Sequence, residues 1–300
     1  MKKIFFSIVA LIIITELSLN IGSVSIDFDS EIGRQIYSNI RLPRVILGIM
    51  VGINLALAGS ILQSVLKNNL ADPHIIGVTS GAGLFGIIAL IYNLPVVPVG
   101  FIGAMLAVTI VLILGRGDKL ILAGVAVSTL FSAGITVVLL INSEKVQGVL
   151  MYMAGSLSAR SWQEVQLITP YTIAGFILTM ILARRLNILE LGDEVATGLG
   201  LKVKTVRLTF LVIAGILAAS AVSVVGMLGF VGLIMPHITR LMVGSDARIL
   251  IPCSAILGGA LVTVCDTFAR TLFSPLELPV GLIMALLGSP FFLYLLRRQN

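Results

Sequence analysis

Charged residues are scarce in this sequence. Asp, Glu, Lys and Arg together make up 11% of the 300 residues, whereas 58% are hydrophobic. A soluble domain carries about 25% charged residues, so this chain has less than half the charge that normally covers a wet surface. The composition therefore excludes the soluble globular, disordered, collagen-like and coiled-coil classes. It indicates an all-α integral membrane protein. At roughly 20 apolar residues per crossing, the length allows about ten transmembrane helices.

Residues that bind metals or carry out catalysis are equally scarce. Cys253 and Cys265 lie on one apolar stretch at a spacing that puts them about 18 Å apart on a helix, too far for a disulfide. His74 and His237 have no clustered partners, so we expect no metal site. The sequence contains no phosphate-binding P-loop and no motif of an intramembrane hydrolase. It predicts neither a cofactor nor an enzyme.

Apolar runs separated by Pro, Gly or charged residues define the predicted membrane spans. The shortest of them contains Pro236, and its separation from the preceding span requires a tight turn at Gly229 and Gly232. Glycines spaced by four, such as Gly48 with Gly52, predict closely packed helices. The ten predicted spans form one transmembrane domain over residues 1–300: 4–20, 45–66, 75–92, 96–114, 120–141, 166–183, 206–228, 229–243, 249–268 and 280–296.

The basic residues predict the orientation of these spans. An even number of crossings places both termini on one side, and Lys2, Lys3, Arg297 and Arg298 favour the cytoplasm. In that orientation the cytoplasmic segments hold 14 of the 20 Lys and Arg residues. This bias is typical of a multi-pass protein of the cell (inner or cytoplasmic) membrane. It also accounts for the net charge of +6 without a nucleic-acid partner.

The first 20 residues allow two interpretations. A basic start followed by an apolar core is typical of a cleaved signal peptide. No small-residue cleavage site closes this run, however, and its removal would leave an odd number of spans. We therefore expect the first span to be retained.

The longest cytoplasmic loop is predicted to contain a short amphipathic helix. Leu191, Val195 and Leu199 recur every four residues, while Asp193 and Glu194 fall on another face. A glycine, at Gly198 or Gly200, ends this helix. The segment is either a docking surface for a cytoplasmic partner or a solvated turn at the bilayer surface.

From residue 41 to the C-terminus, a series of short motifs follows in order: Arg41-Leu-Pro-Arg44, Ala58-Gly59-Ser-Ile-Leu-Gln63, Asn68-Asn-Leu-Ala-Asp-Pro73, Gly77-Val-Thr-Ser-Gly81-Ala-Gly83, Phe230-Val-Gly-Leu-Ile-Met-Pro236-His237-Ile-Thr-Arg240, Asp266-Thr-Phe-Ala-Arg270 and Glu277-Leu-Pro279-Val-Gly281. In this order they resemble the permease subunits of the iron-chelate, haem and cobalamin family of ABC importers, the FecCD-like group. Asn69 departs from that pattern because the family usually has proline there, and the change frees φ and restores a backbone N–H.

The resemblance implies a type II ABC importer permease with about ten transmembrane helices. It implies a homodimer, or a dimer with a close paralogue. The other implied partners are two cytoplasmic P-loop ATPase subunits and an extracytoplasmic substrate-binding protein. Hydrolysis of ATP would take place on the ATPase subunits, so this chain itself is not expected to be an enzyme. The implied activity is import of a metal chelate, a ferric siderophore or haem.

The resemblance also assigns roles to individual residues. Arg41, Arg44 and Arg270 would meet acidic residues of the binding protein; anchoring to lipid headgroups is the alternative role. Segment 188–204 resembles two short coupling helices, with Asp193, Glu194, Gly198 and Gly200 as contacts to the ATPase. The cytoplasmic gate would comprise two groups of residues: Asn68, Asn69 and Leu70, and Gly117 and Asp118.

Two other functions stay open. Cobalamin import by the same type of machine is one. The other is secondary transport driven by an ion gradient. Such transporters bind the coupling ion at ionisable residues near the centres of their spans, and the predicted spans of this sequence carry none there.

Overall fold

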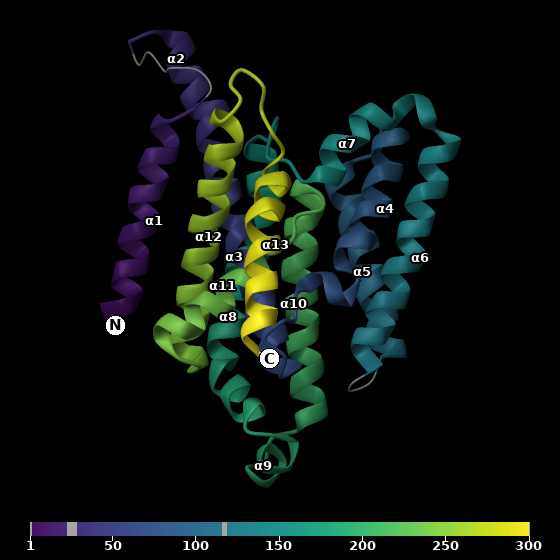
Figure 1. Ribbon diagram of the computed structural model, residues 1–300, viewed down its shortest axis with the longest axis vertical. Coiled ribbons are helices and arrows are strands. Elements are labelled where there is room, and N and C mark those ends of the chain that lie inside the picture. Colours follow the sequence, from purple (N-terminus) through teal and green to yellow (C-terminus); the bar gives the residue numbers. More distant parts are fainter. Residues whose placement is uncertain (1, 23–28, 116–118, 300) are drawn as a thin grey trace.

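The computed structural model describes residues 2–22, 29–115 and 119–299, and within these ranges the chain forms helices and loops without a strand (Figure 1). The predicted all-α class is therefore confirmed. The α-helices are α1 (Lys2–Asn20), α2 (Glu31–Ile36), α3 (Leu42–Val65), α4 (Val78–Ile91), α5 (Val96–Leu114), α6 (Lys119–Ile141), α7 (Val146–Ala154), α8 (Trp162–Glu190), α9 (Asp193–Gly198), α10 (Val203–Val225), α11 (Val231–Val243), α12 (Ala247–Thr271) and α13 (Val280–Gln299).

Each of the ten predicted spans corresponds to one helix of this bundle. Seven helical segments are long and apolar enough to cross a bilayer, and three shorter apolar helices, α4, α11 and α13, account for the other spans. A π-helical turn, Tyr37–Arg41, joins α2 to α3 in one helical run. A 3-10 turn, Pro73–Ile76, precedes α4, and another, Ser143–Lys145, precedes α7. The chain is a multi-pass membrane protein.

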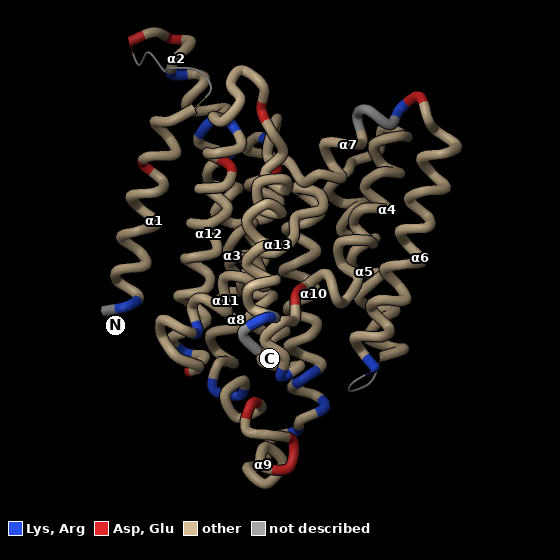
Figure 2. The backbone as a smooth tube through the Cα atoms, in the orientation of Figure 1, with Lys and Arg blue, Asp and Glu red and all other residues tan. Residues whose placement is uncertain are grey.

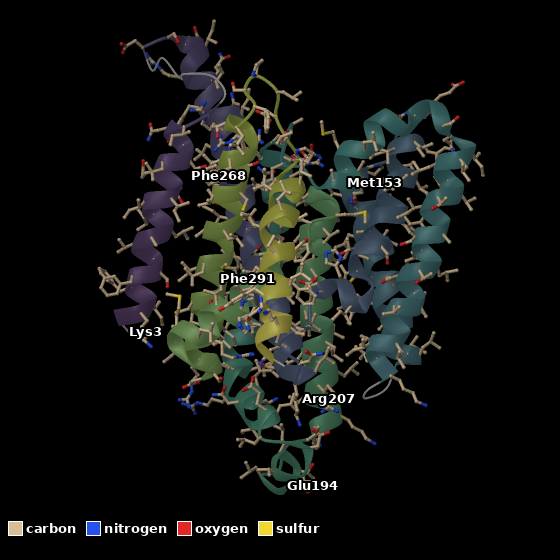
Figure 3. The ribbon with its side chains drawn as sticks, in the orientation of Figure 1. Lys3, Met153, Glu194, Arg207, Phe268 and Phe291 are labelled. Carbon is tan, nitrogen blue, oxygen red and sulfur yellow. The ribbon has the colours of Figure 1, made fainter. Side chains whose placement is uncertain are left out.

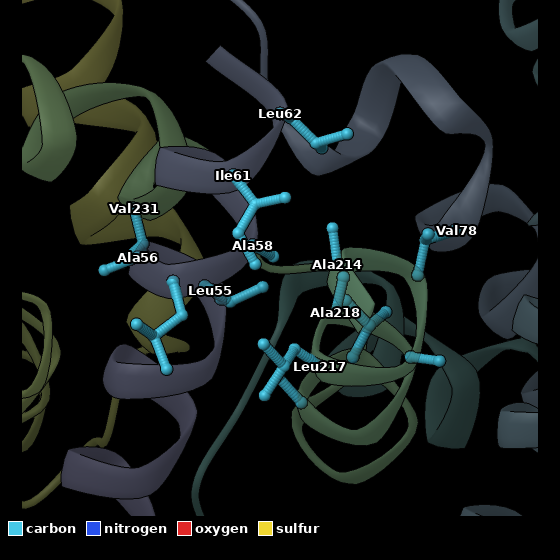
Figure 4. Close-up of a cluster of buried hydrophobic side chains, with 14 of the residues drawn as sticks. Leu55, Ala56, Ala58, Ile61, Leu62, Val78, Ala214, Leu217, Ala218 and Val231 are labelled. Atoms are coloured by element: carbon cyan, nitrogen blue, oxygen red, sulfur yellow. The ribbon is translucent and has the colours of Figure 1, made fainter. Parts of the chain in front are cut away.

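Three helices form the interior of the bundle. In α3 and α10, 78% of the most apolar window is buried inside the protein, and in α12 72% is buried. The corresponding value is 17% for α1 and 22% for α6, so these two helices lie at the periphery. Alanine and leucine side chains of α3 and α10 fill the centre, where α4 and α11 also meet them (Figure 4).

Charged residues gather at the two ends of the bundle and are sparse between them (Figure 2). Helix α9 lies at one end and α2 at the opposite end, and both chain termini lie toward the α9 end (Figure 1). The bilayer offers no partners for charge, so the sparse region between the two ends is the part of the molecule that the membrane surrounds.

Two of the helices are too short to cross the membrane by themselves. Helix α4 has 14 residues and α11 has 13, which gives each a length of about 20 Å. That is less than the roughly 30 Å thickness of a hydrocarbon core. Backbone without regular α-helical hydrogen bonds precedes each of them, and such backbone is stable at membrane depth only inside protein. Before α4, the buried amide of Gln63 in α3 donates to the carbonyl oxygen of Ala71, and it also donates to the carbonyls of Gly232 and Leu233 in the first turn of α11. Before α11, the backbone N–H of Met227 donates to the carbonyl oxygen of Tyr152.

The turn between α10 and α11 differs from the prediction. Gly226 and Phe230 have positive φ values of 87° and 69° and redirect the chain, whereas Gly229 and Gly232 were expected to do so. Gly232 lies within α11, and Pro236 does not interrupt that helix. Only Gly226 could have been expected from the residue type, because a bulky residue such as Phe230 rarely adopts positive φ.

Glycine allows the closest helix contacts. A Cβ atom at Gly52 would overlap the backbone of Gly258 in α12, and one at Gly59 would overlap the carbonyl of Gly232 in α11. Close backbone approach at small residues replaces the hydrophobic driving force that helices in lipid lack. Gly48 makes only ordinary contacts, and Gly77 adopts φ +75° at the start of α4, so its role is conformational.

We predict that Gly59→Leu destabilises the protein by about 2 kcal/mol or more, because overpacking forces α3 away from α11. The loss should appear as earlier thermal unfolding in detergent. Gly198→Ala is the control, since a Cβ atom there meets nothing within 4 Å. Equal stability of the two variants would show that α3 and α11 do not pack as described.

Candidate functional site

A buried cluster of charges lies at the α2 end of the bundle. Arg44 of α3 donates through Nε and Nη2 to Asp266 of α12, with Nη2 at 2.9 Å from Oδ1. Its Nη1 lies 2.7 Å from Oε2 of Glu277, in the loop before α13, and Ser158 also donates to that oxygen. Arg44 therefore connects two long interior helices to the α12–α13 loop.

Two further arginines of this cluster contact the end of α1. Arg270 lies one helical turn after Asp266, and Nε lies 3.4 Å from Oδ2 in the expected i,i+4 pair. Arg270 also donates through Nη2 to the carbonyl and hydroxyl of Ser18, and Arg41 donates to the carbonyl of Leu19. The last carbonyls of a helix have no intrahelical donor and attract cations. The two guanidinium groups thus attach the end of α1, a helix at the periphery of the bundle.

These contacts constrain the role predicted for the three arginines. All three are buried, with 5% of Arg41, 6% of Arg44 and 3% of Arg270 exposed. They nevertheless line a small pocket of about 210 Å³, together with Glu277 and apolar residues of the π-helical region. An acidic side chain of a partner could reach them only by entering this pocket. Sequence reasoning identified the arginines but missed Ser18, Ser158 and the pairing of Arg44 with Asp266, which join distant parts of the chain.

The charge on Glu277 is stabilised by this cluster. Partial burial raises the pKa of the Glu277 carboxyl, but the hydrogen bond and positive charge of Arg44 outweigh it and lower that pKa below its ordinary value. Ser158 and Arg270 act in the same direction. Glu277 is therefore ionised at neutral pH, and its pairing contributes stability that is lost as the pH falls through this lowered pKa.

Helix α9 forms the most prominent feature of the opposite end, where Glu194 and Arg207 are labelled in Figure 3. It presents the three predicted apolar residues to solvent: Leu191 is 61% exposed, Val195 50% and Leu199 61%. Gly192 and Gly200, at φ +115° and +81°, allow the chain to enter and leave the short helix. Exposed apolar residues grouped on a projecting segment are typical of a protein contact surface.

Two ion pairs link α9 to neighbouring parts of the chain. Asp193 lies 2.8 Å from Nη2 of Arg207 in α10 and 3.2 Å from Nζ of Lys67 at the end of α3. Slight burial raises the pKa of Asp193, but its bonds to Lys67 and Arg207 outweigh this and lower it. Because Asp193 is already paired, Glu194 is the acid that α9 presents outward.

The coupling segment has one short helix where the resemblance implied two. Helix α8 continues to Glu190 through Arg184 and Arg185, which were expected to lie in the loop, so α9 alone occupies the space before α10. Gly198 ends α9 and has open space around it.

The predicted gate residues Asn68, Asn69 and Leu70 lie in the loop between α3 and the Pro73–Ile76 turn. The Asn68 side chain accepts from the backbone N–H of Leu70 at 2.9 Å and forms a compact turn. Asn69 accepts a hydrogen bond from Arg240 of α11. Gly117 and Asp118, the other predicted gate residues, lie outside the described residues.

Comparison with known proteins places this architecture in a family. The model of the FecCD transport family matches residues 3–298. The chain belongs to the FecCD transport family. This FecCD member is 38% identical to the hemin transport system permease protein of Yersinia pestis, over 98% of this chain and 95% of the relative. It is 36% identical to an Fe(3+)-citrate import system permease protein of Bacillus subtilis, over 96% and 92%. It is 40% identical to the cobalamin import system permease protein of Halobacterium salinarum, over 90% and 75%.

A solved structure agrees with this assignment. The FecCD chain superimposes with a TM-score of 0.91 and 31% identity on an ABC transporter of the metal-chelate type in an inward-facing conformation, covering 99% of both chains. The permease resemblance read from the motifs is thereby confirmed, with an ABC importer permease architecture.

We predict that Asp266→Asn lowers the free energy of unfolding by about 3 kcal/mol or more, because two buried guanidinium groups lose their shared carboxylate. The measurement is thermal unfolding of the purified protein in detergent. Asp246→Asn is the matched control on the same helix, because Asp246 is exposed and Asn also caps a helix N-terminus well. A loss no greater than that of the control would show that the buried cluster does not stabilise the fold.

Proposed function

We propose that this chain is the permease subunit of an ATP-driven importer that carries a metal chelate, either a ferric siderophore or haem, across the cell membrane. The observation that carries this proposal is similarity along nearly the whole chain to hemin and Fe(3+)-citrate permeases. Cobalamin is the alternative cargo, because the Halobacterium salinarum relative is 40% identical over 90% of this chain. The sequence has no P-loop, so the energy of ATP must enter through a partner.

The proposed assembly contains two copies of the permease, or this chain with a close paralogue. Two cytoplasmic P-loop ATPase subunits and an extracytoplasmic binding protein complete it. In this arrangement the α9 end and both termini face the cytoplasm, and the α2 end faces outward. The excess of basic residues in the segments assigned to the cytoplasm supports this orientation.

The α9 end fits a docking surface for the ATPase. The exposed Leu191, Val195 and Leu199 would enter an apolar groove of the partner, with Glu194 at its rim. The bonds of Asp193 to Lys67 and Arg207 connect α9 to the loop after α3 and to α10. A displacement of the ATPase would therefore be passed to that loop and to the start of α10.

We predict that the tagged chain, purified gently from its native cell, brings a P-loop ATPase in about a one-to-one ratio by quantitative mass spectrometry. Val195→Asp should abolish this association while thermal stability stays within about 0.5 kcal/mol of the parent, as expected for an exposed position. Ser143→Asp, exposed at the opposite end, is the control. Repeated recovery of the intact parent chain alone would reject an ATP-driven importer.

The α2 end fits a docking surface for the binding protein. A carboxylate that enters the pocket lined by Arg41, Arg44 and Arg270 would meet three guanidinium groups, two of which already share Asp266. Arg41 can be changed without breaking those ion pairs, so it offers the cleanest test of the predicted docking role.

We predict that Arg41→Gln weakens the affinity of the co-purifying binding protein about tenfold and reduces its dependence on salt, because one charge-assisted contact is lost. Surface plasmon resonance on nanodisc-embedded protein measures both quantities. Arg34→Gln is the control, since Arg34 lies exposed at the same end. Equal affinities of the parent and both variants would leave the three arginines with a structural role and no docking role.

A further inference from the structure

The loop 66–72, which holds the predicted gate residues, is fastened by side chains from outside it. At its buried end, Gln63 Nε2 lies 3.4 Å from the carbonyl oxygen of Ala71. At its start, Lys67 pairs with Asp193 of α9. In its middle, the amide oxygen of Asn69 accepts from Nη1 of Arg240 in the last turn of α11. The loop is thus connected at once to the body of the protein, to α9 and to α11.

The contact in the middle depends on the residue type at position 69. Proline would restrict φ at this position but has no side-chain acceptor for a guanidinium. Asparagine leaves the backbone freer and supplies a carbonyl oxygen, to which an ionised donor bonds more strongly than a neutral one does. In this chain a hydrogen bond between the loop and α11 therefore does what a proline ring would do by restricting the backbone.

We propose that Asn69 and Arg240 form a latch that holds the loop 66–72 against α11, and that both are positioning residues of the cytoplasmic gate. The role of this loop as a gate rests on the proposed function, whereas the latch is a contact within this chain. Because Lys67 connects the same loop to α9, a movement of α9 would pull on the loop while Arg240 holds it. Release of the latch would then let the loop move with α9.

Open space borders parts of the loop. A pocket of about 370 Å³ is lined by Leu66 and Lys67 of the loop together with Asp193 and Arg207. A second pocket, of about 440 Å³, is lined by Leu70 and Asp72 of the loop together with Phe230 and others. Ala71 is instead packed in the core, so its burial reports whether the loop is in place.

Cysteine labelling can detect release of the latch. Ala71 is fully buried and small, so Ala71→Cys places a thiol that N-ethylmaleimide reaches only when the loop lifts. The purified protein would be labelled in detergent and analysed by mass spectrometry. We expect Asn69→Ala and Arg240→Gln each to raise the labelling rate at position 71 about fivefold or more, and the double variant to add little further. Asn69→Asp, which keeps the acceptor, should preserve the slow rate.

Two controls separate the latch from general loss of stability. Cys253 and Cys265 are fully buried and report global unfolding, so their labelling should stay slow in every variant. Arg248→Gln removes an exposed arginine that pairs with Asp246 and should change nothing at position 71. If Ala71→Cys does not yield monodisperse protein, backbone amide hydrogen exchange of segment 66–72 serves as the probe, because the Ala71 N–H donates to the carbonyl of Asn68 within the folded loop.

Three results would each overturn the latch. The labelling rate at position 71 could stay unchanged, the effects of the two latch variants could add, or labelling of Cys253 and Cys265 could accelerate as much as labelling at position 71. None of these readouts needs an ATPase, a binding protein or a cargo. A failed latch would therefore leave the proposed importer function standing. Purification of the chain without an ATPase would reject the gate role of the loop but not the contact between Asn69 and Arg240.

Discussion

The structure depends on one constraint: inside a bilayer, every backbone polar group must find its partner within the protein. Continuous helices satisfy this by themselves, but the segments before α4 and α11 do not. Gln63 of α3 supplies a buried amide that donates to the carbonyl of Ala71 before α4 and to that of Gly232 in the first turn of α11. The absence of a Cβ atom at Gly59 lets α11 come close enough for this. In the segment before α11, Met227 donates its N–H to the carbonyl of Tyr152. Helix α3 thus contacts both short crossings through one side chain.

The charged side chains at the two ends of the bundle differ in how deeply they are buried. At the α2 end, Arg44, Asp266 and Arg270 are almost fully buried, and removal of one of them would leave unpaired charge in the interior. At the α9 end, Asp193 and Lys67 are about half exposed, so water competes for them and each pair contributes little to stability. The first arrangement favours a rigid end and the second an end that can rearrange at low cost. An importer needs this asymmetry if one face receives cargo and the other responds to ATP.

Much of the fold could be predicted from composition and apolar periodicity, because a span in lipid is specified by length and hydropathy. All ten spans correspond to helices. The repeat of Leu191, Val195 and Leu199 likewise predicted a short helix in this loop, which α9 confirms, but it did not predict that all three side chains are exposed. The turn after α10 was placed wrongly, because Phe230 adopts a conformation that its residue type disfavours. The charge cluster could be predicted only within one helix, where Asp266 and Arg270 share a face. The bond of Arg44 to Asp266 joins residues more than 200 positions apart, and no local pattern encodes it.

The position of Asn69 shows how one departure from a family pattern can be compensated elsewhere in the fold. Proline restricts a loop by its own ring and needs no neighbour. Asparagine restricts the same loop only if another element supplies a donor, and Arg240 is that donor here. A ring constrains the loop in every state of the protein, whereas a hydrogen bond constrains it only while α11 stays close. The contact of Asn69 with α11 therefore depends on the arrangement of the helices around it, as the proposed gate would require.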